Sequence, residues 1–99
     1  IAFPYEEYQK ATAENAERIL AAAANAAKAK NVSYTVKHVK DQFPAEGIVS
    51  AAKEGACDLI VMASHGRRGL TRLILGSQAA TVVISSAIPV LIYREPEQT

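Results

Sequence analysis

The side chains best suited to chemistry in this sequence gather in one short stretch, residues 59–77. An apolar run, Leu59–Ala63, ends in the small and polar sequence Ser-His-Gly-Arg at residues 64–67. A second glycine, Gly76, precedes Ser77 at the start of a predicted helix. A helix that begins after a glycine presents free backbone N–H groups and the positive end of its dipole, which suits a phosphate group. Because arginines add positive charge nearby, we interpret this stretch as an anion-binding loop of the nucleotide-binding kind.

Each candidate residue has a structural reading beside the functional one. Gly66 and Gly76 either let backbone amides surround a phosphate or only permit turns, and the whole pattern favours the first reading. Ser77 either donates its hydroxyl to a phosphate or caps the following helix, and one serine can do both. For His65, a contact with phosphate or ribose and a role in fixing the loop are evenly balanced. Arg67 is the preferred charge partner, whereas the neighbouring arginines are expected to be solvated.

Other chemistries find little support. Asp58 and His65 lie at opposite ends of a predicted strand, roughly 16 Å apart at ~3.3 Å per residue, so with Cys57 they form neither a metal site nor a catalytic triad. Ser64 has no facing, acid-supported histidine. The sequence contains neither the G-x4-G-K-[ST] loop of phosphoryl-transfer enzymes nor the G-x-G-x-x-G turn of dinucleotide-binding proteins. We therefore expect no metal site, no catalytic residue and little or no catalysis.

Composition limits the function classes. The 99 residues, 49% of them hydrophobic, fit one small globular domain. A formal net charge of +1 gives no basic field for nucleic acid, and the apolar runs are far shorter than a membrane span. The single cysteine allows no internal disulfide, which fits a cytoplasmic protein. We expect neither nucleic acid nor a membrane as partner.

Two helices and a strand are predicted before the loop. A helix over Glu6–Lys30 is rich in alanine, with acids first and lysines last. Apolar and polar residues alternate over Val32–Val39, which predicts a strand. Pro44 begins a second helix, which Gly55 stops. Helical spacing predicts a buried face on the first helix, made of Tyr8, Thr12, Ala16, Ile19, Ala23 and Ala26. The inner face of the second helix is predicted to hold Ile48, Val49, Ala51 and Ala52.

The remaining elements surround the loop. The unbroken apolar run Leu59–Ala63 predicts a parallel strand buried on both faces. A short helix is expected from Gln78 to about Ser86 with Val82 and Val83 inward, and a last strand over residues 90–93. Alternating helices and strands predict an α/β fold with a parallel sheet.

At this point the loop shows a likeness to a known family. Met62–Ser77, together with the following Pro89–Arg94, resembles the signature of the universal stress protein family, whose loop reads G-x2-G-x9-G-[ST]. In this sequence the four places are held by Ala63, Gly66, Gly76 and Ser77. Ala63 therefore stands where the family usually has its first glycine.

The resemblance implies a Rossmann-like fold: an open parallel sheet with helices on both faces and five strands in the spatial order 3-2-1-4-5. In that fold Val32–Val39 is the third strand and Leu59–Ala63 the fourth. The strand–helix–strand unit that normally comes first is absent. We therefore expect residues 1–99 to form one universal stress protein domain that is incomplete at its N-terminus.

The resemblance also implies a stress-response role with an adenine nucleotide site, for ATP, AMP or ADP, and with Mg²⁺ held through the phosphates. Any ATP hydrolysis would be slow. Met62 would lie against the adenine. The implied nucleotide-binding residues are Met62, Ala63, Ser64, His65, Gly66, Arg67, Gly76, Ser77, Gln78 and Ala79. A homodimer through the last strand is implied as well, with the interface Val90, Leu91, Ile92 and Tyr93. Burial of that apolar edge in a dimer would remove an aggregation hazard.

Two alternatives stay open. The same fold can act as a dimerisation or interaction module without nucleotide, and alanine at position 63 is the main argument for it, because alanine disfavours a positive φ. An enzyme of a related nucleotide-using α/β family is the third reading, and it lacks a catalytic constellation.

Overall fold

The computed structural model describes residues 5–64 and 75–94 of the chain. The chain divides into two compact units, Ile1–His38 and Val39–Thr99.

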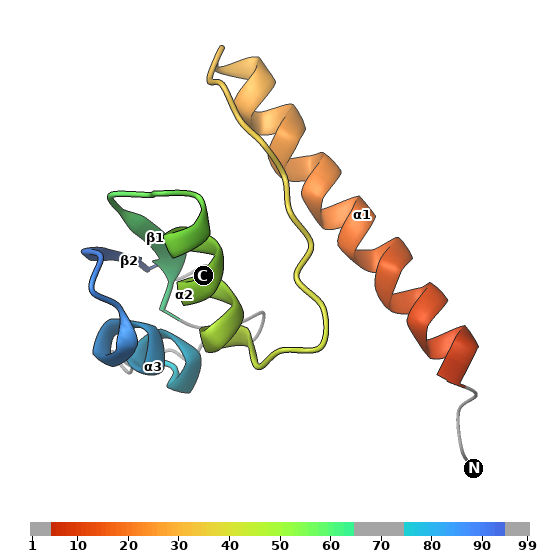
Figure 1. Cartoon of the computed structure of the whole chain (residues 1–99). Helices are drawn as coiled ribbons and strands as arrows, with labels where there is room; N and C mark the ends of the chain where they lie inside the picture. The colour runs from red at the N-terminus through yellow and green to blue at the C-terminus, as the bar shows by residue number, and fades with distance from the viewer. Residues whose placement is uncertain (1–4, 65–74, 95–99) are drawn as a thin grey trace, which may run out of the picture. The chain divides into compact units, whose positions relative to one another are not determined.

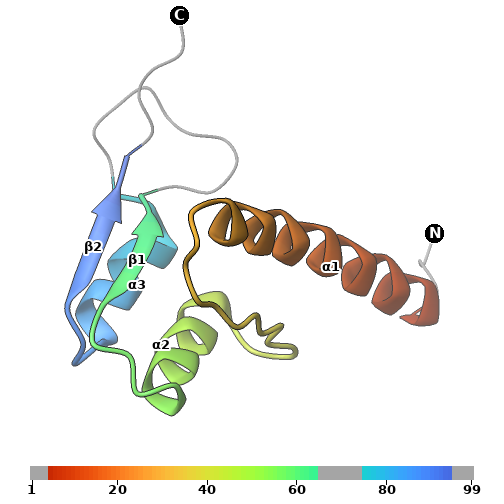
Figure 2. The ribbon, with the colours of Figure 1, turned by 90° about the horizontal axis from the view of Figure 1, so that it is seen from above.

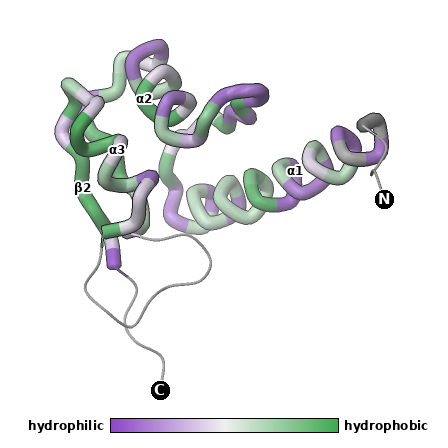
Figure 3. The backbone as a smooth tube through the Cα atoms, turned by 90° about the horizontal axis from the view of Figure 1, so that it is seen from below, coloured by the Kyte–Doolittle hydropathy of each residue, from purple (hydrophilic) through white to green (hydrophobic). Residues whose placement is uncertain are grey.

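The first unit consists of a long helix and an extended segment (Figure 1). Helix α1 spans Tyr5–Ala29, which confirms the predicted helix to within one residue at each end. After a turn at Asn31 the chain runs extended to His38. The N-terminal half of α1 is mostly hydrophilic and its C-terminal half mostly hydrophobic (Figure 3).

The predicted buried face of α1 is largely wrong. Its half-buried residues are Ala16, Leu20, Ala24 and Ala27. Only Ala16 was expected among them, whereas Thr12, Ile19, Ala23 and Ala26 are exposed. The exposure of Tyr8 lies outside the described side chains. Alanine occurs on every side of this helix, so the periodicity of small residues does not fix which side is covered.

The predicted strand over Val32–Val39 is also wrong, because none of these residues belongs to a strand. None of them lies in a helix or has a positive φ, but a strand also needs a neighbouring chain to accept and donate its backbone hydrogen bonds. In the described residues the sheet has two strands, β1 and β2, which pair with each other. Local propensity was read correctly and the pairing was not.

The second unit is a two-stranded parallel sheet with two helices. Helix α2 spans Pro44–Glu54, β1 Ile60–Ala63, α3 Ser77–Ser85 and β2 Val90–Tyr93. The strands lie side by side and point the same way (Figure 2), in a register that runs from Ile60 opposite Val90 to Ala63 opposite Tyr93. The helices begin and end close to the predicted positions, and Pro44 is the first residue of α2, as predicted.

A small core joins the two helices to one face of the sheet. Its buried residues are Ala45, Ala52, Ile60 and Val82, and Ile48, Val49, Met62, Ile88 and Val90 pack against them. The inner face predicted for α2 is therefore largely correct. Two details were wrong: Val61 of β1 is 60% exposed, and Val83 is 45% exposed whereas Val82 is fully buried. Because α2 and α3 pack on the face that carries Ile60 and Met62, the side chains that alternate with them remain exposed.

Both α1 and α2 end in the same backbone motif. Asn31 after α1 and Ala56 after α2 adopt left-handed conformations, with φ of 56° and 51°. The next amides, of Val32 and Cys57, donate to the carbonyls five residues earlier, Ala27 and Ala52, at 3.0 and 2.9 Å. These bonds are the signature of a Schellman motif. Gly55 does follow the last residue of α2, but its φ is −81°, so the left-handed position that favours glycine is held by an alanine.

Within the described residues, no helix combines the length and apolar character that a membrane span requires.

Candidate phosphate-binding turn

The candidate site lies where β1 ends and α3 begins. The amide of Gly76 donates to the carbonyl oxygen of Ser64 at 2.7 Å, and the amide of Ser64 donates to the carbonyl oxygen of Tyr93 at 2.8 Å. Ser64, itself buried, therefore ties the carboxyl ends of both strands to the start of α3. In open α/β sheets this edge is where ligands bind.

The first turn of α3 offers free donors. The amide of Ala80 donates to the carbonyl oxygen of Gly76 at 2.9 Å, which closes the first helical turn. The amides of Ser77, Gln78 and Ala79 have no acceptor among the described residues, because the first N–H groups of a helix have no intrahelical partner. The Gly76 amide, expected to face a phosphate, is engaged inside the turn. The amides of residues 77–79 are therefore the backbone donors of this turn that remain open to an anion.

The structure separates the two readings of Ser77. The N-cap of α3 is Gly76, in an extended conformation, and no described side chain makes a capping hydrogen bond there. Ser77 is the first helical residue, its carbonyl accepts from the Thr81 hydroxyl at 2.9 Å, and its own hydroxyl is not used as a cap. The side chain of Ser77 is exposed and remains accessible to an incoming ligand.

The neighbouring candidates differ in what they can contribute. Gln78 is exposed, whereas Ala79 is buried and can offer only its backbone. Met62 packs against the core, which is the structural reading of a methionine in a strand. Ala63 lies in β1 opposite Tyr93 and does not have a positive φ. Alanine therefore costs nothing in backbone strain there, which weakens the main sequence argument for a non-binding protein.

The remaining predicted residues fall into two groups. His65, Gly66 and Arg67 lie outside the described residues. In β2, Val90 and Ile92 are half-buried, whereas Leu91 and Tyr93 are exposed. No group of three or more His, Cys, Asp or Glu side chains in the described part of the chain is placed to hold a metal ion.

Sequence reasoning missed the role of the Ser64 and Tyr93 backbones in holding the turn. Both act through main-chain groups, which every residue carries, so the residue types gave no signal. A signal existed in the spacing alone: the last predicted strand, placed parallel to β1, brings the end of one strand beside the end of the other.

Comparison with known proteins adds three findings. The model of the universal stress protein family matches residues 1–94. Universal stress protein MJ0531 of Methanocaldococcus jannaschii is 42% identical over 55 residues, which is 56% of this chain and 32% of that protein. A universal stress protein of Thermus aquaticus, from the region 3′ of a QAH/OAS sulfhydrylase, is 45% identical over 51 residues, 52% of this chain and 37% of the relative.

A solved structure is similar over most of the chain. It is the structure of hypothetical protein MJ0577, described as a test case for assigning biochemical function from structure, and M. jannaschii is its organism. The match has a TM-score of 0.70 and 30% identity and covers 94% of this chain but 64% of that chain. The matches thus span about a third of these two curated relatives and less than two thirds of the solved chain.

The likeness to the solved structure, with the parallel strands and their connecting helix, confirms the predicted α/β class. The family model covers nearly the whole chain. This chain belongs to the universal stress protein family.

Proposed function

We propose that this protein binds an adenine nucleotide, ATP or its products ADP and AMP, by its phosphates at the start of α3, as part of a stress response. The observation that carries the proposal is the hydrogen-bonded turn from Ser64 to Gly76 at the sheet edge. Among the described residues, this turn leaves the amides of residues 77–79 without acceptors. Membership of the universal stress protein family supports the stress-related role.

The chain's own groups fit an anionic ligand. The amides of residues 77–79 and the Ser77 hydroxyl are donors, and the N-terminus of a nine-residue helix adds a positive dipole end. His65, Gly66 and Arg67 remain part of the proposed site. Mg²⁺, when bound with ATP, would neutralise phosphate charge and be held mainly by phosphate oxygens. We assign the protein little or no catalysis, and a place in the cytoplasm that agrees with its free, exposed Cys57.

Calorimetric titration with ATP, ADP and AMP tests the proposal. Ser77→Ala removes the hydroxyl alone, whereas Ser77→Pro removes both the hydroxyl and the amide at a helix position where proline is tolerated. We expect Ser77→Ala to weaken binding about tenfold and Ser77→Pro to weaken it further, because hydrogen bonds to a charged group are the strong ones. Ser85→Ala, an exposed serine at the other end of α3, is the matched control and should leave binding unchanged. Equal affinity of all variants, or no binding by the parent chain, would contradict the proposal.

The second candidate is an interaction module that dimerises through β2 and takes no nucleotide. Leu91, Tyr93 and Val61 expose apolar surface on the sheet face away from the core, and this observation favours an interface. Sedimentation measures it: Leu91→Glu should convert a dimer to a monomer, with the exposed Ile84→Glu as control. A dimer without any heat on ATP addition, where Ala63→Gly restores the heat, would favour this candidate over the first.

A further inference from the structure

Two consecutive backbone hydrogen bonds join the end of β2 to the start of α3. The carbonyl oxygen of Tyr93, the last residue of β2, accepts from the amide of Ser64 at 2.8 Å. The carbonyl oxygen of Ser64 accepts in turn from the amide of Gly76, the N-cap of α3, at 2.7 Å. We call these two bonds the backbone relay. Because Ser64 is only 9% exposed, opening either bond leaves backbone polar groups poorly hydrated, which disfavours the open state.

The backbone relay fixes the place where α3 begins. The amides of residues 77–79 have no acceptor among the described residues, and an anion must find them together in one place. With the bond from Gly76 to Ser64 open, the start of α3 is held by its own first turn alone, and helix ends fray. A bound phosphate group therefore favours the closed relay, because it gains its contacts fully only in that state.

Strand β2 has a second edge, on the side away from β1. The carbonyls of Pro89 and Tyr93 bond to β1, and backbone groups alternate in direction along a strand, so those of Val90 and Ile92 point to the outer edge. Among the described residues no strand lies along that edge. In the family fold that the sequence resembles, the last strand likewise lies at the edge of the sheet. The peptide group between Ile92 and Tyr93 joins the two edges, so a strand that bonds to the Ile92 carbonyl also orients the residue that begins the relay.

A second copy of β2 fits this outer edge. Val90–Tyr93 contains no charged residue, so two copies bring no like charges against each other. Two identical edges related by a two-fold axis form an interface that closes at two copies. The dimer through β2 therefore places its backbone hydrogen bonds directly beside the relay.

We propose that dimerisation through β2 and nucleotide binding at the start of α3 strengthen each other through the backbone relay. The second copy and the phosphate group each favour the state in which both relay bonds are closed. The coupling is reciprocal, so nucleotide tightens the dimer because dimerisation tightens nucleotide binding. This coupling rests on the nucleotide site proposed above, whereas the response of the relay to dimerisation does not.

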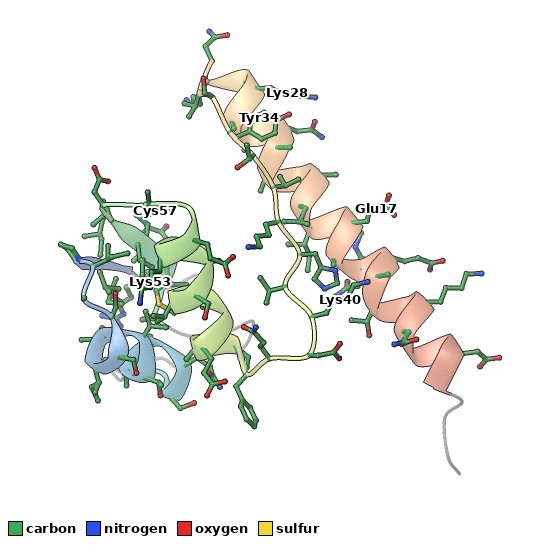
Figure 4. The ribbon with its side chains drawn as sticks, viewed as in Figure 1. Glu17, Lys28, Tyr34, Lys40, Lys53 and Cys57 are labelled. Carbon is green, nitrogen blue, oxygen red and sulfur yellow. The ribbon has the colours of Figure 1, made fainter. Side chains whose placement is uncertain are left out.

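Hydrogen exchange without nucleotide tests the relay itself. The intact chain is compared at protein concentrations well below and well above the dimer dissociation constant, which sedimentation determines. We expect the amides of Ser64 and Gly76 to exchange at least about fivefold more slowly in the dimer. The control is the amide of Cys57, which follows α2 (Figure 4) and donates to the carbonyl oxygen of Ala52 at 2.9 Å. Its exchange should change by less than about twofold. Equal exchange of the relay amides in monomer and dimer, or no dimer at any concentration, overturns the proposal.

Displacement of a fluorescent ATP analogue by ATP, at the same two protein concentrations, measures the coupling. We expect the dimer to bind ATP at least about fivefold more tightly than the monomer. Saturating ATP should then lower the dimer dissociation constant by the square of that factor, because a dimer holds two nucleotide sites. Equal ATP affinity of monomer and dimer overturns the coupling and leaves the nucleotide site standing. No ATP binding at either concentration overturns the nucleotide site, and the coupling with it.

A proline at position 76 breaks the relay at one bond. Gly76 has a φ of −62°, close to the angle that proline requires, so Gly76→Pro removes the amide hydrogen without forcing that angle. Gly76→Ala keeps the amide and is the matched variant. The ratio of the ATP affinities of dimer and monomer should fall below about twofold in Gly76→Pro and keep its original value in Gly76→Ala. An unchanged ratio in Gly76→Pro, or a lost ratio in Gly76→Ala, overturns the relay as the path of the coupling.

Discussion

The ends of α1 and α2 are nearly the same, yet the segments that come after them adopt different structures. After α1, Asn31 turns the chain in a left-handed conformation and Val32 bonds back to Ala27; after α2, Ala56 and Cys57 repeat both features with Ala52. Both motifs lead into apolar, β-branched sequence. Only the second of these sequences, Ile60–Ala63, becomes a strand.

The difference lies in what the chain brings alongside. The crossover from β1 through α3 returns the chain as β2, parallel to β1, and the turn at Ser86 helps to aim it. In that turn the amide of Ile88 donates to the Ser86 hydroxyl oxygen at 2.9 Å. Among the described residues no strand lies beside residues 32–38, so the same local preference does not produce a strand there. A strand is therefore decided by its partner, and propensity only makes it possible.

The largest expected effect tests whether the second unit depends on its small core. Val82→Asp places a charge at a fully buried position of α3, in the core shared with α2 and the sheet, and we expect a loss of several kcal/mol, enough to unfold a marginally stable unit. Urea unfolding of the Val82→Asp variant and of the unsubstituted protein measures this loss of stability. The matched control is Val83→Asp, one residue along and 45% exposed, which should keep the fold. If both variants unfold alike, the core is not where we place it.

Hydrogen exchange sharpens the comparison directly. The amides of Ile60 and Ser64 bond to Pro89 and Tyr93 across the sheet, whereas those of Tyr34 and Thr35 have no acceptor in the described part of the chain. We expect the first pair to exchange at least about a hundredfold more slowly than the second, after correction for intrinsic rates. Equal rates would mean that the two extended stretches do not differ as described.

The ends of α1 and α2 differ in the residue that adopts the left-handed conformation, which is Asn31 after α1 and Ala56 after α2. Ala56→Gly should raise the free energy of unfolding by about 0.5–1 kcal/mol, because alanine is strained at φ 51° and glycine is not. Asn31→Gly should gain only a few tenths of a kcal/mol, since asparagine tolerates this conformation. Thermal or urea unfolding measures both. A larger gain in the free energy of unfolding from Asn31→Gly than from Ala56→Gly would contradict this explanation.

The smallest effect is expected on the exposed side of α3. Ile84 is 84% exposed two residues after Val82, and Ile84→Ser should change the free energy of unfolding by no more than about 0.5 kcal/mol. A loss comparable to that of a core substitution would show that Ile84 is covered in solution. The measurement is the same urea titration.

Prediction from sequence succeeded where the signal was local and redundant. The alanine-rich stretch marked α1, Pro44 marked α2, and the residues after Gly76 marked α3. The run Val90–Tyr93 marked the last strand. Prediction failed where the sequence allowed more than one buried face. Helix α1 carries alanine on all sides, and in α3 the neighbours Val82 and Val83 have the same side chain although only Val82 is buried. Helix periodicity alone cannot choose between adjacent residues of similar size.

For the candidate site, the sequence predicted a loop and the start of a helix, whereas only the structure showed the backbone hydrogen bonds of the turn. The glycine before Ser77 predicted a helix N-terminus with free amides, and those of residues 77–79 are unpaired among the described residues. Only the structure showed that the Gly76 amide donates to the Ser64 carbonyl oxygen and that Gly76 rather than Ser77 is the N-cap. Main-chain bonds between distant segments carry no mark in residue type.

The sequence by itself determined which stretches prefer helix or extended backbone, and where helices begin and end. Those properties depend on neighbours a few residues apart. Only the tertiary structure decided which extended stretch became a strand, which face of each helix was covered, and which amides remained free. Those outcomes depend on segments that are distant along the chain, because pairing and burial each need a second surface.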